Sequence, residues 1–124
     1  MTIEFTLIIG LIFHFIGDYL IQNHWLATNK TSNSLVALIH VIIYSLPFLL
    51  ITSLSAVAII LTTHFFIDRF RLAQYWIKLV NWNWKSTNFG YTEDVPKFLS
   101  IWLMIIIDNT FHIIINSLSI YYLT

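Results

Sequence analysis

The chain alternates between long apolar runs and short polar stretches. Apolar residues dominate positions 4–26, 35–53, 55–80 and 97–123, and the stretches "TNKTSNS", "TSLS" and "NWNWKSTNFGYTEDVP" lie between them. Each run has roughly the 20 residues that a helix needs to cross a bilayer core. This pattern predicts an all-α fold, namely an integral membrane four-helix bundle that forms a single transmembrane domain over residues 1–124.

The composition of the chain agrees with this pattern. Of the 124 residues, 58% are hydrophobic and 10% are charged, and the mean hydropathy is +0.78, which is too apolar for an ordinary soluble domain. The lipid bilayer is therefore the expected partner. Six basic and six acidic residues balance, which argues against a nucleic-acid partner. Because the chain has no cysteine, a metal site must use imidazole or oxygen ligands.

The basic residues are unevenly distributed along the chain. All six lie in or beside the first and third polar stretches, and the five Trp residues flank the same two stretches: Lys30, Arg69, Arg71, Lys78, Lys85 and Lys97 are the basic residues. The positive-inside rule places these stretches in the cytoplasm, and Trp residues favour the same membrane interface. The sequence thus predicts a multi-pass protein with both termini outside.

Polar residues interrupt the apolar runs at helical spacing. In "FHFIGDYLIQNHW", His14 and Asp18 are four residues apart and share a helix face, and two further His/Asp pairs repeat this spacing. An ionised Asp at mid-membrane costs at least ~2.5–3.5 kcal/mol, so these groups need compensation. We expect a shared intramembrane site, with seven candidate metal ligands: His14, Asp18, His40, His64, Asp68, Asp108 and His112.

Four imidazoles and three carboxylates suit a divalent metal. Zinc is the first expectation, manganese, iron and nickel are alternatives, and seven ligands suffice for one or two ions. Gln22 and Asn116 extend the polar faces and are expected to orient the ligands. The charges have three other possible compensations: protonation of the carboxyl groups, hydrogen bonds between helices, and ion pairs with Arg69 or Arg71.

A short internal repeat suggests a duplicated helical hairpin. An offset of 50 residues sets "HFIGD" (14–18) over "HFFID" (64–68). Such a duplication would make the first and third helices parallel, related by an axis along the membrane normal.

Four segments carry a resemblance to a known family: "HFIGDYLIQNHWLA", "ALIHVIIYSLPF", "THFFIDRFRL" and "DNTFHIIINSL". With them, the chain resembles the small membrane proteins of bacteria and their phages grouped as domain of unknown function 3307. The resemblance covers essentially the whole chain. It implies a bacterial or phage origin and a place in the bacterial cell (inner) membrane, and it implies no activity.

The candidate site is compatible with a metal-dependent membrane hydrolase that acts on a lipid-derived ester or phosphoester. The metal would lower the pKa of a bound water to about 7, and an uncoordinated Asp or His would act as general base. In this hypothesis Asp68 and Asp108 are the catalytic candidates. Arg69, Arg71 and Gln22 are the candidates for binding an anionic headgroup.

Two other classes of function fit the same sequence. Intramembrane ionisable residues also mark ion pathways, so the protein is alternatively a carrier of metal ions or protons, which with four helices requires a homodimer. A non-catalytic phage membrane protein, such as a holin or a defence-modulating partner, fits the small size. It does not explain the His and Asp residues.

Overall fold

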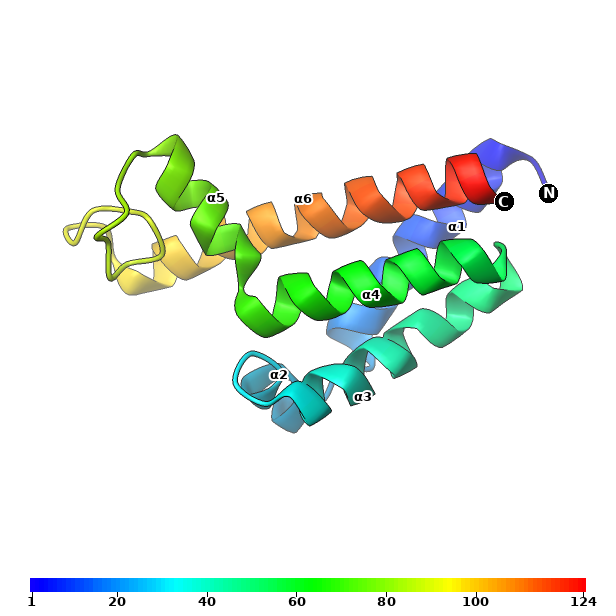
Figure 1. The fold of residues 1–124 in the computed structure, drawn as a ribbon, viewed down its shortest axis with the longest axis horizontal. Coiled ribbons are helices and arrows are strands. Elements are labelled where there is room, and N and C mark those ends of the chain that lie inside the picture. The colour runs from blue at the N-terminus through cyan, green and yellow to red at the C-terminus, as the bar shows by residue number, and fades with distance from the viewer.

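The computed structural model describes all 124 residues, and its fold is all-α, as the sequence predicts (Figure 1). A π-helical turn, η1, continues the first helix, and a 3-10 turn, η2, continues the third. The elements in chain order are α1 (Ile3–Phe15), η1 (Ile16–Leu20), α2 (His24–Asn29), α3 (Ser34–Ser45), η2 (Leu46–Leu50), α4 (Leu54–Phe70), α5 (Leu72–Val80) and α6 (Lys97–Leu123).

The four longer helices pack lengthwise, and α2 and α5 lie apart from each other, both toward the end away from the chain termini (Figure 1). In this arrangement α1 and α4 run in one direction, and α3 and α6 run in the other. Both chain termini lie at the end opposite α2 and α5. The connections of "TNKTSNS" and of the loop at residues 81–96 therefore share one end of the molecule.

Polar residues cap the N-termini of several helices. The side chains of Asn23, Asn33 and Ser53 accept hydrogen bonds from backbone N–H groups in the first turns of α2, α3 and α4. Such caps satisfy N–H groups that have no partner within the helix. Arg71 has the left-handed backbone conformation, φ 47° and ψ 54°, so α4 ends there and the chain turns into α5.

The first apolar run is less regular than the sequence predicts. The helix ends at Leu20 instead of continuing through residue 26, and α2 follows as a separate short helix. The π turn at its end forms i→i+5 hydrogen bonds, which turn the residues after Phe15 relative to a regular α-helix. Gly17 lies in this turn, where a Cβ atom would collide with the ring of Tyr44. The missing side chain allows η1 and α3 to approach closely.

The later helices follow the apolar runs more closely. The second run forms α3 and η2 and ends at Leu50, and the third is divided into α4 and α5 at Arg71. Helix α6 spans the fourth run, Lys97–Leu123. Two helical segments, Ile3–Leu20 and Lys97–Leu123, are long and apolar enough to cross a membrane.

The interior of the protein is unusually polar and its surface unusually apolar. Polar residues are almost as numerous as apolar ones among the buried side chains, whereas Leu20, Leu50 and Leu54 are at least 75% exposed. Soluble proteins distribute these residues in the opposite way. Apolar clusters lie around Tyr44 and Phe48 near the termini and around Ile77 near α5. The arrangement is typical of a chain with apolar surroundings.

Candidate metal centre

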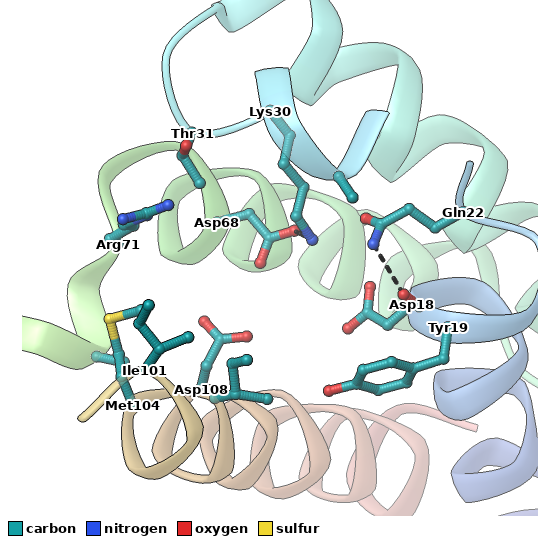
Figure 2. A pocket seen from close by; sticks show the side chains of 13 residues that line it. Asp18, Tyr19, Gln22, Lys30, Thr31, Asp68, Arg71, Ile101, Met104 and Asp108 are labelled. Atoms are coloured by element: carbon teal, nitrogen blue, oxygen red, sulfur yellow. Dashed lines mark hydrogen bonds and ion pairs between the residues drawn. The ribbon is translucent and has the colours of Figure 1, made fainter. Parts of the chain in front are cut away.

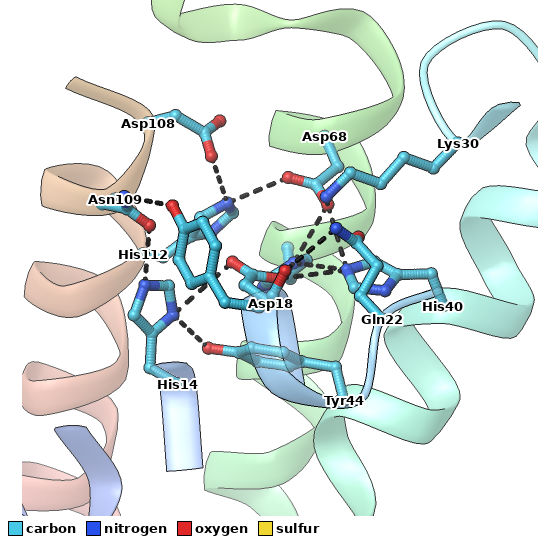
Figure 3. A network of polar contacts seen from close by, with 12 residues as sticks. His14, Asp18, Gln22, Lys30, His40, Tyr44, Asp68, Asp108, Asn109 and His112 are labelled. Atoms are coloured by element: carbon cyan, nitrogen blue, oxygen red, sulfur yellow. Dashed lines mark hydrogen bonds and ion pairs between the residues drawn. The ribbon is translucent and has the colours of Figure 1, made fainter. Parts of the chain in front are cut away.

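Six His and Asp residues from four helical elements meet inside the bundle. Five of them are buried, and the side chain of Asp108 is 26% exposed. Figure 3 shows the carboxylates of Asp18 and Asp68 and the rings of His40 and His112 pointing toward one another. The residues are Asp18 on η1, His40 on α3, His64 and Asp68 on α4, and Asp108 and His112 on α6. This buried cluster can hold a metal ion.

Four of these residues form a closed set, which we call the inner subsite: Asp18, His40, His64 and Asp68. The Nε2 atoms of His40 and His64 are 3.2 Å apart. Each of these two nitrogens also lies 3.1–3.2 Å from one oxygen of Asp18 and from one oxygen of Asp68.

Hydrogen bonds alone do not explain these distances. An imidazole nitrogen carries at most one hydrogen, so it can donate to only one of the three atoms that surround it. A tetrahedral zinc ion with ligand bonds of about 2.0 Å holds its ligands about 3.3 Å apart. The observed separations in the inner subsite, 3.1–3.2 Å, are close to that value. The donor set therefore fits a tetrahedral metal ion.

The remaining residues form a second set around Asp68, which we call the outer subsite: Asp68, Asp108 and His112. Nε2 of His112 lies 3.0 Å from Oδ1 of Asp68 and 3.2 Å from Oδ2 of Asp108. The other oxygen of Asp68, Oδ2, faces the inner subsite. Asp68 thus spans both subsites as a bridging carboxylate can. Three ligands leave one position of a tetrahedral ion open.

The structure does not bring His14 into either subsite. Its Nδ1 lies 2.7 Å from the hydroxyl of Tyr44, and its Nε2 lies 2.9 Å from Oδ1 of Asn109. An amide oxygen only accepts, so Nε2 donates to Asn109 and Nδ1 accepts from Tyr44. Nδ1 of His14 also lies 3.7 Å from Oδ2 of Asp18, which is farther than the His–Asp distances within the two subsites. Both ring nitrogens of His14 are already in use.

Lys30 belongs to the cluster, although in the sequence its position predicts only the orientation of the chain in the membrane. Its Nζ lies 2.8 Å from Oδ2 of Asp68, as Figure 3 shows. Burial would lower the pKa of Lys30, but the carboxylates of Asp68 and Asp18 outweigh burial and raise this pKa above its usual value. No local spacing reveals this residue, because the loop after α2 brings it to α4.

A cavity of about 240 Å³ adjoins both subsites (Figure 2). The carboxylates of Asp18, Asp68 and Asp108 face it. Gln22 also lines it, and the side-chain amide of Gln22 donates to the backbone oxygen of Asp18 at 2.9 Å. The other lining residues include Tyr19, Lys30, Arg71, Ile101, Met104 and Ile105.

The two arginines predicted to bind a headgroup have different positions. Arg71 lines the cavity. Arg69 does not: its guanidinium donates to Oγ of Ser34 at 3.0 Å and to the backbone oxygen of Thr31 at 2.9 Å. Arg69 therefore joins α4 to the start of α3, and of the pair only Arg71 is next to the candidate centre.

Aromatic and amide side chains fix the orientation of the histidines. The ring of His64 stacks on that of His112 with centroids 3.9 Å apart, and the ring of Tyr44 lies 3.9 Å from His64 on centroids. Asn116 was expected to orient a metal ligand. It donates to the Tyr44 hydroxyl at 2.8 Å, so it can orient a histidine only indirectly, by holding Tyr44. Asn109 was not foreseen, because it lies beside the Asp108/His112 face rather than on it.

Fold and cluster together define a class: a small all-α protein with candidate membrane-spanning helices and a buried His/Asp cluster that can hold a metal. The family described as "Protein of unknown function (DUF3307)" matches residues 6–123, and the chain belongs to that family. This match confirms the resemblance carried by the four sequence segments. No curated protein and no solved structure matches the chain.

Proposed function

We propose that the protein is a metal-dependent membrane hydrolase with four membrane spans, formed by α1–η1, α3–η2, α4 and α6. An even number of spans requires both termini on one side, and both termini do lie at one end of the molecule (Figure 1). The basic loops lie at the other end, which the positive-inside rule assigns to the cytoplasm. The termini then face outward from a bacterial cell membrane.

The inner subsite carries this proposal. Five of the distances between its four ligand atoms are 3.1–3.2 Å, close to those around a tetrahedral ion, and its two imidazoles and two carboxylates suit zinc. Asp68, Asp108 and His112 would hold a second divalent ion in the outer subsite, which would give a two-metal hydrolytic site. All six ligands come from one chain, so the centre needs no second copy of the protein.

The outer subsite is the reactive one, because it has only three ligands and one of them, Asp108, is 26% exposed. A metal there supplies Lewis acidity and lowers the pKa of bound water. One oxygen of Asp108 contacts His112, and its second oxygen is left to accept a proton from the attacking water. Asp68 belongs to both subsites and fixes their relative position. The expected substrate is an ester or phosphoester derived from a lipid.

Elemental analysis and hydrolysis assays on the purified protein test this function. Wild type in lipid nanodiscs should contain two zinc ions, or other divalent ions, per chain and should hydrolyse p-nitrophenyl butyrate or p-nitrophenyl phosphate. Asp108→Asn keeps the shape of the side chain and removes the proton acceptor, so the rate should fall by about 10²-fold or more. His24→Ala is the control, because His24 is exposed on α2.

A carrier predicts a different result. Metal uptake into proteoliposomes by the wild type, without hydrolysis of either ester, would show that the cluster moves ions instead of activating water. A protein that is free of metal after purification and does not bind added zinc would contradict both functions.

A further inference from the structure

The cavity beside the outer subsite has an unbalanced set of charges. Three carboxylates and two cations line it, and Nζ of Lys30 lies 2.8 Å from Oδ2 of Asp68 (Figure 2): the carboxylates are those of Asp18, Asp68 and Asp108, and the cations are Lys30 and Arg71. Without a metal ion, the carboxylates outnumber the two cations. One divalent ion on these ligands is enough to reverse the sign, because the ion is then the largest local charge. The metal-loaded cavity attracts an anion.

Arg71 is the group in this cavity that is ready to receive an anion. Its guanidinium makes no hydrogen bond or ion pair within the protein, and its carbon lies 5.6 Å from the ring centroid of Phe89. The left-handed backbone at Arg71 places the side chain at the junction of α4 and α5, on the cavity wall. A guanidinium presents several N–H donors in a planar fork, which matches the oxygens of a phosphate group.

One wall of the cavity, on the side of Arg71, is apolar. Ile101, Met104 and Ile105 on α6 line it, and Ile101 is 39% exposed. From Ile101 to Asp108 the wall extends about 10 Å along the helix, at ~1.5 Å per residue. Tyr19, which is 52% exposed, lies at the edge of the same space. The cavity therefore leads from the apolar surface of α6 to the carboxylates.

The size of the cavity limits what enters it. Its volume of about 240 Å³ is smaller than the ~300–1,000 Å³ typical of pockets that enclose a whole drug-sized ligand. A headgroup fits inside, whereas a lipid chain has to remain outside, along α6 and the surrounding membrane. The exposed apolar residues of α6, such as Trp102 at 63%, provide that surface.

We propose that this cavity binds the phosphate-monoester headgroup of an amphiphile, with Arg71 on the phosphate and the apolar chain beside Ile101 and Met104. This inference rests on the proposed function and names the substrate class of the same centre. In the hydrolysis, a water oxygen bonds to phosphorus and the ester P–O bond breaks. One water proton passes to the departing alcohol oxygen, and the other remains on the released phosphate.

The test measures phosphate release from dioleoyl phosphatidic acid by zinc-loaded protein in nanodiscs, with zinc content determined on the same samples. Arg71→Gln should lower kcat/KM at least tenfold while zinc content stays at the wild-type level, which also shows that the variant is folded. The kcat/KM of Arg71→Lys should lie between those of wild type and Arg71→Gln, because lysine keeps the charge and loses the planar set of N–H donors. Lys78→Gln, on α5 outside the cavity, is the matched control and should behave as wild type.

The outcomes separate this inference from the proposed function. Normal zinc content with hydrolysis of p-nitrophenyl butyrate but not of phosphatidic acid overturns the phosphate headgroup and leaves the hydrolase. Full activity of Arg71→Gln on phosphatidic acid overturns the role of Arg71. Inhibition by inorganic phosphate at concentrations as low as the KM for phosphatidic acid would show that the apolar chain adds nothing, against the proposed amphiphile. Absence of any bound divalent metal ion, with no binding of added zinc, overturns the hydrolase itself.

Discussion

The inner and outer subsites share Asp68, but their surroundings differ. In the inner subsite, Asp18, His40 and His64 complete a set of four ligands whose side chains are at most 5% exposed. In the outer subsite only Asp108 and His112 accompany Asp68, and Asp108 is 26% exposed to the cavity. One half of the cluster is closed, and the other half is open to a ligand.

This difference separates a structural task from a chemical one. Closed sites with four protein ligands contribute binding energy to the folded state, whereas catalytic sites keep a position for water or substrate. The inner subsite joins η1, α3 and α4, three elements that no continuous apolar core holds together at this depth. We therefore expect its loss to unfold the bundle more readily than loss of the outer subsite.

The bridging carboxylate should give the largest effect. Asp68→Asn removes a charged ligand from both subsites and leaves Lys30 without its partner, so both metal ions should be lost. If each ion is present at 100 times its dissociation constant, their loss costs about 5 kcal/mol of stability. Metal content by elemental analysis and the melting temperature in detergent measure this. A more stable Asp68→Asn protein, unaffected by chelator, would mean that Asp68 is a strained ion-paired carboxylate instead of a ligand.

Two histidines offer a matched comparison of the subsites. His40→Ala should remove the inner ion and lower stability by about 3 kcal/mol, whereas His112→Ala should remove the outer ion, abolish hydrolysis and cost less stability. Each variant should retain about one ion per chain. Metal content, melting temperature and hydrolysis rate on both proteins check this prediction. Equal destabilisation by the two variants would remove the proposed division between a structural and a reactive subsite.

A chelator should remove the ions of the two subsites at different rates. Because the side chain of Asp108 is 26% exposed and those of the inner ligands are at most 5% exposed, a brief exposure to a chelator should remove the outer ion first. Activity should then disappear while the melting temperature stays close to that of the loaded protein. Simultaneous loss of activity and of thermal stability over the whole time course would contradict separate sites. Zinc added back after the brief treatment should restore activity.

The smallest effect is expected outside the ligands. Tyr44→Phe removes the hydroxyl that bonds His14 and Asn116 and keeps the ring against His64. The lost hydrogen bonds should cost about 1–3 kcal/mol, because they leave buried polar groups without a partner. Metal content should remain two ions per chain. A fall in metal content would indicate that His14 acts as a ligand after rotation of its ring.

The residues of the cluster could be predicted from the sequence because helical spacing is local. His64 and Asp68, and Asp108 and His112, lie on one face of a regular helix, and burial of ionisable groups in an apolar run requires them to meet. The same rule pairs His14 with Asp18, and Nδ1 of His14 does lie 3.7 Å from Oδ2 of Asp18, but both ring nitrogens of His14 have other hydrogen-bond partners at shorter distances. Those partners, Tyr44 on α3 and Asn109 on α6, lie far from His14 in the sequence, and no local pattern contains them.

The surroundings of the cluster could not be predicted because they depend on loops. Lys30 reaches Asp68 only because α2 reverses the chain after η1. Arg69 and Arg71 are equivalent in the sequence, and the left-handed backbone at Arg71 gives them opposite directions. Lys30 is the one charge of the first polar stretch, where it helped to predict the side of the membrane, and the structure shows that its ammonium lies beside Asp68.

The polar interior and apolar exterior have a consequence for temperature. The heat-capacity change on unfolding of soluble proteins, about 12–15 cal/mol/K per residue, comes chiefly from apolar surface that becomes hydrated. In the membrane-embedded bundle proposed here, separated helices expose residues such as Ile60 and Phe48 to lipid instead of water. Little apolar surface is hydrated, so the free energy that holds the helices together should change almost linearly with temperature. Cooling should then strengthen the bundle steadily, without the cold-side weakening of a soluble domain.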